Sequence, residues 1–164
     1  MDWSNDATYD SGADVGIVNG FWGGDEAQQV STTVSVPSGA TAAVLELRYW
    51  ALDSWDGGET AYIQIDGTTV WELDRNGYND CAGWEDYTGD ADIPDPWGGE
   101  DNHHCYSDVS LSMDVSSSFE LVIGTEIGSS SSDESWGFSS FSITFNDEGT
   151  PLKNNQKDRK STRL

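Results

Sequence analysis

The chain has 164 residues, a length that predicts one domain able to bury a hydrophobic core. Eight Trp, six Tyr and five Phe argue against a disordered acidic chain, because disordered segments contain few aromatic residues. Thirty acidic residues face seven basic ones, giving a formal net charge of -23 at pH 7. Since nucleic acid and anionic lipid are bound through Lys and Arg, this charge excludes both as expected partners, and we expect no membrane insertion.

The basic residues are concentrated at the end of the chain. Only Arg48 and Arg75 precede Lys153. The acidic part of the chain therefore repels itself, which destabilises a compact state unless cations bind or screen the charge. Two explanations are open: specific calcium sites, or a general acidic surface adapted to high salt. The clustering of the acids in a few loops favours calcium.

Alternating apolar and polar residues predict β-strands along most of the chain. The first 27 residues are expected to hold an initial strand and an aromatic loop, followed by strands at 30–36, 42–51, 60–65, 68–73, 109–115, 119–127 and 141–145. Residues 42–51 have apolar side chains at both parities, which predicts a central strand covered on both faces. Asp66-Gly67 predicts a hairpin turn. No ten-residue segment shows a helical period.

Short strands separated by turn residues indicate an all-β fold. We expect a two-sheet antiparallel β-sandwich of seven to nine strands, with a jelly roll as the preferred topology. The domain is predicted to span residues 1–146. Within it, residues 74–108 form a long polar excursion, which is uncommon unless the loop is functional or stapled. Residues 147–164 are predicted to be a disordered basic tail.

Two acidic motifs each combine carboxylates with a tryptophan and a glycine: the first spans residues 53–59 and the second residues 133–137. Carboxylates this close repel one another unless protons or a cation neutralise them. Calcium accepts six to eight oxygen ligands from such loops. We predict a Ca²⁺ site with the ligands Asp53, Asp56, Glu59, Asp133 and Glu134, and with Asp25 or Asp66 in reserve. The alternative is a pair of solvated turns, in which aspartate is common.

Two cysteines, Cys81 and Cys105, enclose most of the polar excursion. They are predicted to form a disulfide, which implies an oxidising compartment. Free thiols, or a metal role with His103 and His104, are the alternatives.

The excursion also carries aromatic residues on a loop, where binding residues are often found. We predict that Trp84, Tyr87 and Trp97 bind a ligand, against the alternative that they form a small hydrophobic cluster.

Several runs together resemble a known kind of domain. They are Tyr49–Asp56, Glu59, Tyr62–Gly67 and Ser132–Phe138 with Phe141. Over about residues 14–146 the chain resembles an extracellular β-sandwich domain that recurs in surface and secreted proteins of protists, ciliates especially. More loosely, it is similar to galactose-binding-like and carbohydrate-binding-module jelly rolls, which often hold a structural calcium. The resemblance implies an extracellular, calcium-holding, non-enzymatic module. The departures from it are Gly57-Gly58 and the excursion between the cysteines.

The predicted function is a calcium-stabilised extracellular module that binds carbohydrate or a cell-surface glycoprotein, in recognition or adhesion. The alternatives are a structural spacer of a surface coat or adhesin, and a fragment of a secreted glycoside-active enzyme. We expect no enzyme, because the surplus of acids singles out no catalytic pair and no nucleophile or phosphate-loop motif occurs. The chain opens on polar residues without a secretory or membrane-spanning segment. Because the predicted disulfide implies an oxidising compartment, we expect Met1 to begin a fragment of a larger exported protein, with a cytoplasmic protein as the alternative.

Overall fold

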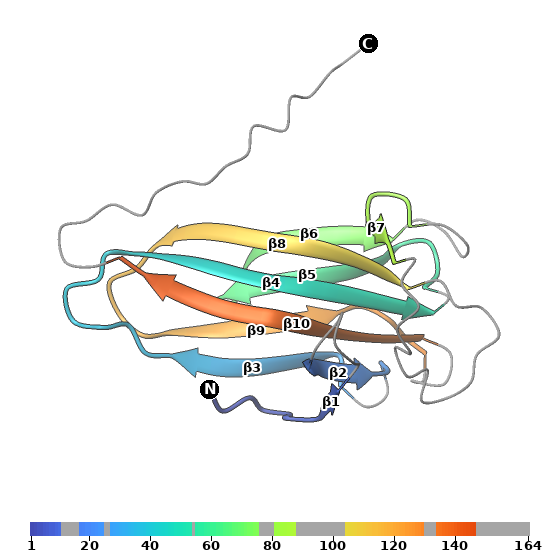
Figure 1. The fold of residues 1–164 in the computed structure, drawn as a ribbon, viewed down its shortest axis with the longest axis horizontal. Coiled ribbons are helices and arrows are strands. Elements are labelled where there is room, and N and C mark those ends of the chain that lie inside the picture. Colours follow the sequence, from blue (N-terminus) through green and yellow to red (C-terminus); the bar gives the residue numbers. More distant parts are fainter. Residues whose placement is uncertain are drawn as a thin grey trace, which may run out of the picture.

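The computed structural model is a sandwich of two β-sheets (Figure 1). It describes residues 1–10, 17–24, 27–53, 55–75, 81–87, 104–129 and 134–146, so the predicted tail at 147–164 lies outside it. The described strands are β1 (Thr8–Asp10), β2 (Ile17–Trp22), β3 (Gln29–Val34), β4 (Ala42–Asp53), β5 (Glu59–Ile65), β6 (Thr68–Arg75), β7 (Glu85–Asp86), β8 (Cys105–Asp114), β9 (Phe119–Thr125) and β10 (Glu134–Phe145). Within these ranges, no helix has the length and apolar character needed to cross a membrane.

The strand pairing is that of a jelly roll. One sheet has the order β1-β2-β10-β4-β8-β7 and the other β3-β9-β5-β6. Apart from the short β1 and β7, the first strand pairs with the last, and the pairing nests inward: β2 with β10, β3 with β9, β4 with β8 and β5 with β6. All these pairs are antiparallel, and the nested order confirms the predicted topology. The described strands number ten, one more than the upper limit expected from the sequence. The strands β1 and β7 have three and two residues, too few to show an alternating pattern of apolar and polar side chains.

Strand β4 is central, as predicted, and lies between β10 and β8. Only its second half is covered on both faces, since the four side chains from Tyr49 to Leu52 are all at most 2% exposed. In its first half Leu45 and Leu47 are buried while Glu46 between them is exposed. The outer face of the six-stranded sheet is therefore apolar at one end and polar at the other.

The predicted hairpin at Asp66-Gly67 is present between β5 and β6. Both residues have positive φ, 48° and 76°, as a tight hairpin turn requires. The turn is also tied to β9: Asp66 N donates to the Glu120 carbonyl oxygen at 3.0 Å, and Glu120 N donates to Asp66 Oδ1 at 2.9 Å.

The core between the sheets is largely aromatic. The ring of Tyr49 stacks on Trp136 with centroids 5.7 Å apart, and Trp22 lies 4.9 Å from Trp136. Polar atoms on these rings reach backbone acceptors: Trp136 Nε1 donates to the Ala27 carbonyl oxygen at 2.8 Å, and the Tyr49 hydroxyl donates to Gly124 at 3.0 Å. Burial of the large rings thus leaves both of these donors satisfied.

Two glycines allow β2 and β10 to approach closely. Gly20 has a φ of 141°, and a Cβ there would lie 2.4 Å from the Cα of Gly137. The register of the two strands shifts at this point, between Trp136 and Gly137. Any larger residue at position 20 would push apart the first and last long strands of the jelly roll.

We predict that Gly20→Ala lowers the free energy of unfolding by about 2 kcal/mol or more, because it combines an unfavourable φ with a backbone clash. The control is Gly57→Ala, where a Cβ would meet nothing within 4 Å. Denaturant unfolding of both variants measures the difference. Equal stability of the two variants would contradict this account of the β2–β10 contact.

Candidate functional site

The pairing of β4 with β10 brings the two acidic motifs together at one end of the sandwich. Asp53 at the end of β4 is the register partner of Glu134 at the start of β10. The second motif therefore begins a strand, where the sequence analysis expected a loop. Trp55 then crosses to β10, where its Nε1 donates to the Ser135 carbonyl oxygen at 3.0 Å, and its ring is fully buried. The predicted proximity of the motifs is present.

The predicted calcium ligands differ in their surroundings. Asp56 is exposed in the turn before β5, and its N–H donates to Glu59 Oε2 at 2.5 Å, so Glu59 caps that turn. Glu134 is 2% exposed. Asp133 and the side chain of Asp53 lie outside the described residues. Among the side chains that the structure describes, no three His, Cys, Asp or Glu lie together as a metal site requires.

The reserve ligands do not join this group. Asp66 lies at the other end of β5 from Glu59, about 20 Å away at the rise of a β-strand. Its carboxylate caps Glu120 N instead. Asp25 lies outside the described residues.

A buried arginine lies at the same end of the sandwich, and the sequence analysis gave it no role there. Arg75 ends β6 opposite Glu59 and is 0% exposed. Its neighbour Asp74 accepts a hydrogen bond from Trp84, whose ring lies 6.0 Å from Trp55. The carboxylates of the first acidic motif are predicted to need a cation that neutralises them. In three dimensions Arg75 supplies a second source of positive charge.

Of the three predicted ligand-binding aromatics, Trp84 is a core residue. It is 8% exposed, and its ring packs against Tyr49, Trp55 and Trp71 with centroids 5.8 to 6.4 Å apart. Tyr87 is half-buried against Trp50 on the outer face of the six-stranded sheet, with centroids 5.4 Å apart. Trp97 lies outside the described residues. A ligand role for Tyr87 and Trp97 stays a prediction.

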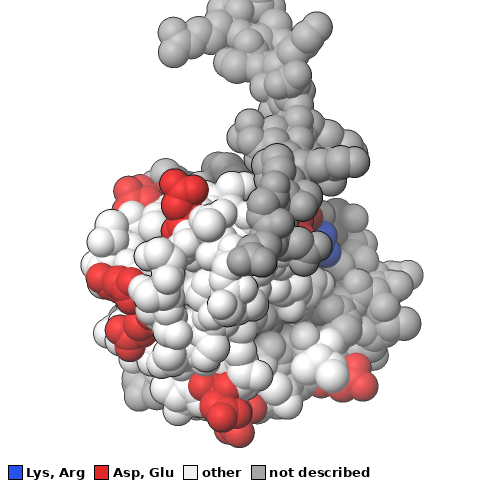
Figure 2. Space-filling model, turned by 90° about the vertical axis from the view of Figure 1, so that its left-hand side faces the viewer, with Lys and Arg blue, Asp and Glu red and all other residues white. Residues whose placement is uncertain are grey.

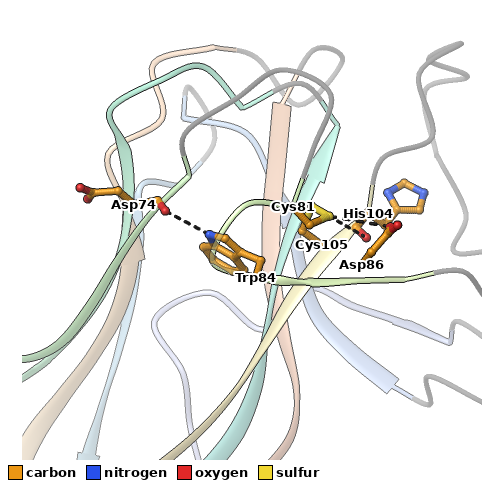
Figure 3. The surroundings of a disulfide bond; sticks show 6 residues. All are labelled: Asp74, Cys81, Trp84, Asp86, His104 and Cys105. Atoms are coloured by element: carbon orange, nitrogen blue, oxygen red, sulfur yellow. Dashed lines mark hydrogen bonds between the residues drawn. A yellow bond between two sulfur atoms is a disulfide. The ribbon is translucent and has the colours of Figure 1, made fainter. Parts of the chain in front are cut away.

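Of the alternatives for the two cysteines, the structure contains the disulfide, which joins Cys81 to Cys105 across a sequence separation of 24 (Figure 3). The segment from Cys81 to Tyr87 lies along the end of β8, where Tyr87 N donates to the His104 carbonyl oxygen at 2.9 Å. On the other side of this segment, Trp84 Nε1 donates to the Asp74 carbonyl oxygen at 3.2 Å. The disulfide thus fixes Trp84 in the core between the two sheets.

A groove that the sequence analysis did not predict lies on the outer face of the four-stranded sheet. Its volume is about 330 Å³, and it is lined by Gln28, Thr60, Tyr62, Gln64, Thr69, Glu72, Thr125 and Glu126. Most of these residues are the outward members of β5 and β6, whose inward members form the core. The lining therefore combines one aromatic ring with amides, hydroxyls and two carboxylates.

Tyr62 occupies the middle of this face. On one side it pairs with Glu72, and on the other with Gly124, which in turn pairs with Gln29 of β3. A Cβ on Gly124 would lie 2.6 Å from the ring and hydroxyl of Tyr62, so the ring lies across the glycine. The hydroxyl donates to Gln29 Oε1 at 3.0 Å. The ring is thereby held against the sheet at both ends of its side chain.

Burial, and secondarily the nearby Glu126 carboxylate, raises the pKa of the Tyr62 phenol. The phenol is therefore protonated at neutral pH and remains a donor to Gln29. The sequence does carry a signal for this face, since Thr60, Tyr62 and Gln64 alternate with buried residues. That alternation predicts the strand and also marks these three side chains as its outward ones.

Acidic residues are not confined to the motif end. Figure 2 shows the opposite end of the molecule, where Asp and Glu lie in separate groups around a mostly uncharged centre. The one ion pair among described residues joins Arg48 to Asp108 on the six-stranded sheet, with Nε 2.7 Å from Oδ1. The charge pattern therefore leaves both sequence explanations open, bound calcium and a generally acidic surface.

Scans against protein-family models and against curated proteins found no match. The resemblance to a protist surface domain therefore stays a prediction.

Similar solved structures include the cycloalternan-forming enzyme from Listeria monocytogenes in complex with a pentasaccharide substrate (14% identity, TM-score 0.41). Others are an exo-β-1,3-galactanase from Phanerochaete chrysosporium with β-1,3-galactotriose (12%, 0.36) and a carbohydrate-binding module from Cellvibrio mixtus lichenase 5A with cellotriose (14%, 0.37). The chain is covered over 89%, 85% and 89%, and spans 11%, 26% and 89% of those chains. At this level the similarity assigns no ligand.

We predict that replacing both cysteines by serine lowers the free energy of unfolding by about 3 kcal/mol, because an open loop of this length gains entropy in the unfolded chain. Unfolding followed by tryptophan fluorescence, with and without reductant on the native sequence, measures the loss. Because the bond positions Trp84, the near-ultraviolet dichroism of the folded state is expected to change as well. A double variant as stable as the native protein would show that the loop is held by its other contacts.

Proposed function

We propose that the protein is a carbohydrate-binding module that holds its ligand in the groove on the outer face of the four-stranded sheet. The observation that carries this proposal is the lining of the groove around Tyr62. A neutral polyhydroxylated ligand needs closely spaced donors and acceptors together with an aromatic surface for its apolar face. The groove offers all three kinds of group on one sheet.

The hydrogen-bonding groups complement one another. Amides and hydroxyls both donate and accept, while carboxylates only accept. Gln28 Nε2 donates to the Ile127 carbonyl oxygen at 3.3 Å, and Gln64 Nε2 donates to Thr69 Oγ1 at 3.4 Å. The amide oxygens of both side chains are oriented by these bonds. Sugar hydroxyls would therefore meet acceptors whose positions are already set.

The groove is also preorganised by the sheet beneath it. Tyr62 is fixed by Gln29 and by its contact with Gly124, whose own carbonyl accepts the Tyr49 hydroxyl from the core side. Side chains that are ordered before binding lose less conformational entropy when the ligand docks. This support differs from the predicted one, in which a metal orders the loops. The disulfide supports a location in an oxidising compartment.

Two other functions remain alternatives: a spacer of a surface coat without a ligand, and a fragment of a glycoside-active enzyme. A spacer needs the rigid sandwich but no Tyr62 platform. An enzyme needs two carboxylates that flank a scissile bond at controlled separation. Binding without hydrolysis of the bound oligosaccharide distinguishes our proposal from both.

We predict that Tyr62→Ala weakens binding of a neutral oligosaccharide about tenfold, by removing the stacking surface. The ligand is first selected on a glycan array and its affinity then measured by calorimetry. Tyr106→Ala is the matched control, since Tyr106 lies half-buried on the outer face of the other sheet. If a folded sample binds no glycan, the spacer becomes the better explanation. If Tyr106→Ala alone loses affinity, the ligand lies on the six-stranded sheet.

We also propose that Ca²⁺ stabilises the end with the two acidic motifs, with Glu134 as its most buried ligand. A buried carboxylate costs free energy unless positive charge or hydrogen bonds compensate it. The proposal is supported by the burial of Glu134 and by its register position beside Asp53. The competing source of charge at that end is Arg75.

Calcium at about 100 times its Kd is expected to stabilise the protein by about 2.7 kcal/mol, because the ion binds only the folded state. Thermal melts at low salt with calcium or with chelator measure this shift, and Glu134→Gln should abolish it. Magnesium and NaCl at equal ionic strength are the controls. An unchanged melt with chelator contradicts the calcium site, and rescue by NaCl alone favours a surface adapted to high salt.

A further inference from the structure

We infer that the groove prefers oligosaccharides with protonated amino groups, of the glucosamine type, over neutral sugars and rejects acidic ones. This inference rests on the proposed function and names the sugar class. It follows from the charged groups that face the groove and from the places where the described basic residues lie.

Two carboxylates flank the Tyr62 platform. Glu72 is its direct register partner on β6, and Glu126 N donates to the Thr60 carbonyl oxygen at 2.9 Å on the β9 side. Both side chains are exposed at the groove. A third carboxylate, that of Asp74, accepts the Thr60 hydroxyl at 2.8 Å beside them.

No described basic side chain offsets this charge. The described residues include two arginines and no lysine, and the guanidinium of Arg48 pairs with Asp108 on the other sheet, 4.0 Å from the centroid of the Tyr106 ring. Arg75 is turned into the sandwich and is 0% exposed. A uronate or sulfated sugar would therefore bring negative charge to the groove without meeting a cation from these residues.

An amino sugar matches both parts of the site. Its ring can lie on Tyr62 as a neutral sugar does, while its ammonium group meets the carboxylates at the edges and the electron-rich face of the phenol. A neutral sugar meets the Tyr62 ring and the hydrogen-bonding groups but brings no positive charge to the carboxylates. Burial raises the pKa of the Tyr62 phenol, and the Glu126 carboxylate raises it further, which shows that this carboxylate acts on the ring.

The experiment compares four tetramers of similar size by calorimetry at low salt: glucosamine, N-acetylglucosamine, glucose and galacturonate. Glucosamine is expected to bind about fivefold tighter than the two neutral tetramers, since two exposed ion pairs each contribute modestly. Galacturonate is expected to show no binding. The preference should shrink as salt is raised and as the pH rises through the pKa of the sugar amine.

Substitutions separate the contribution of the groove carboxylates from that of the Tyr62 ring. Glu72→Gln combined with Glu126→Gln should equalise the glucosamine and glucose affinities, because the amides keep the size of the side chains and remove their charge. Tyr62→Ala should weaken both. The control is Glu46→Gln, which removes an exposed carboxylate from the outer face of the six-stranded sheet and should change neither affinity.

The outcomes separate the two proposals. Equal binding of glucosamine and neutral tetramers overturns this inference and leaves the proposed function standing. No binding of any tetramer overturns both. Tetralysine serves as a probe of charge alone: if it binds as tightly as the glucosamine tetramer, the groove recognises positive charge rather than a sugar, and the inference falls.

Discussion

The antiparallel pairing of β4 with β10 is the contact on which the rest of the structure depends. It extends from Asp53–Glu134 at one end to Ala43–Phe145 at the other. It holds the last strand in the centre of the six-stranded sheet, between β4 and β2, and so closes the nested order of the jelly roll. It also places Trp136 against Tyr49 in the core and the second acidic motif beside the first. The register shifts once, between Ser139 and Ser142, where Ser140 has a positive φ of 54°. A bulge of this kind bends the strand and lets one long strand keep its pairing along the twisted sheet.

The scarcity of positive charge decides how the two outer faces differ. Arg48 lies on the six-stranded sheet, where its guanidinium donates to Asp108 and lies over the Tyr106 ring. The hydrogen bond to Asp108 raises the pKa of that guanidinium. Arg75 ends β6, and its side chain is fully buried. On the outer face of the four-stranded sheet neither arginine is exposed, so the carboxylates there face solvent with amides and hydroxyls between them. This distribution disfavours anionic ligands and leaves a polar, mildly aromatic groove.

The disulfide-bonded segment from Cys81 to Tyr87 supports the core, whereas the groove lies on the outer face of the other sheet. The disulfide and β7 attach the first part of the polar excursion to β8, and the result is that Trp84 fills the end of the core. A tryptophan in a polar, cysteine-bounded loop resembles a ligand contact in sequence, whereas its packing here is that of a structural residue. The groove instead uses side chains of regular strands, whose positions are set by the core beneath them. Rigid strands position a small set of polar groups more accurately than loops do.

The sequence by itself determined the all-β class, the jelly roll, most strand positions, the Asp66-Gly67 turn and the meeting of the two acidic motifs. These follow from local alternation, turn chemistry and the short range of possible sandwich topologies. Only the tertiary structure decided what the outward residues of β3, β5 and β9 do together, because Gln29, Tyr62 and Gly124 are far apart in the chain and become neighbours through strand register alone. The same holds for Arg75, which is sixteen positions from Glu59 in sequence and opposite it in the sheet. Alternation tells which side chains point outward, but the partner strand that lies beside each of them is fixed only when the sheets assemble.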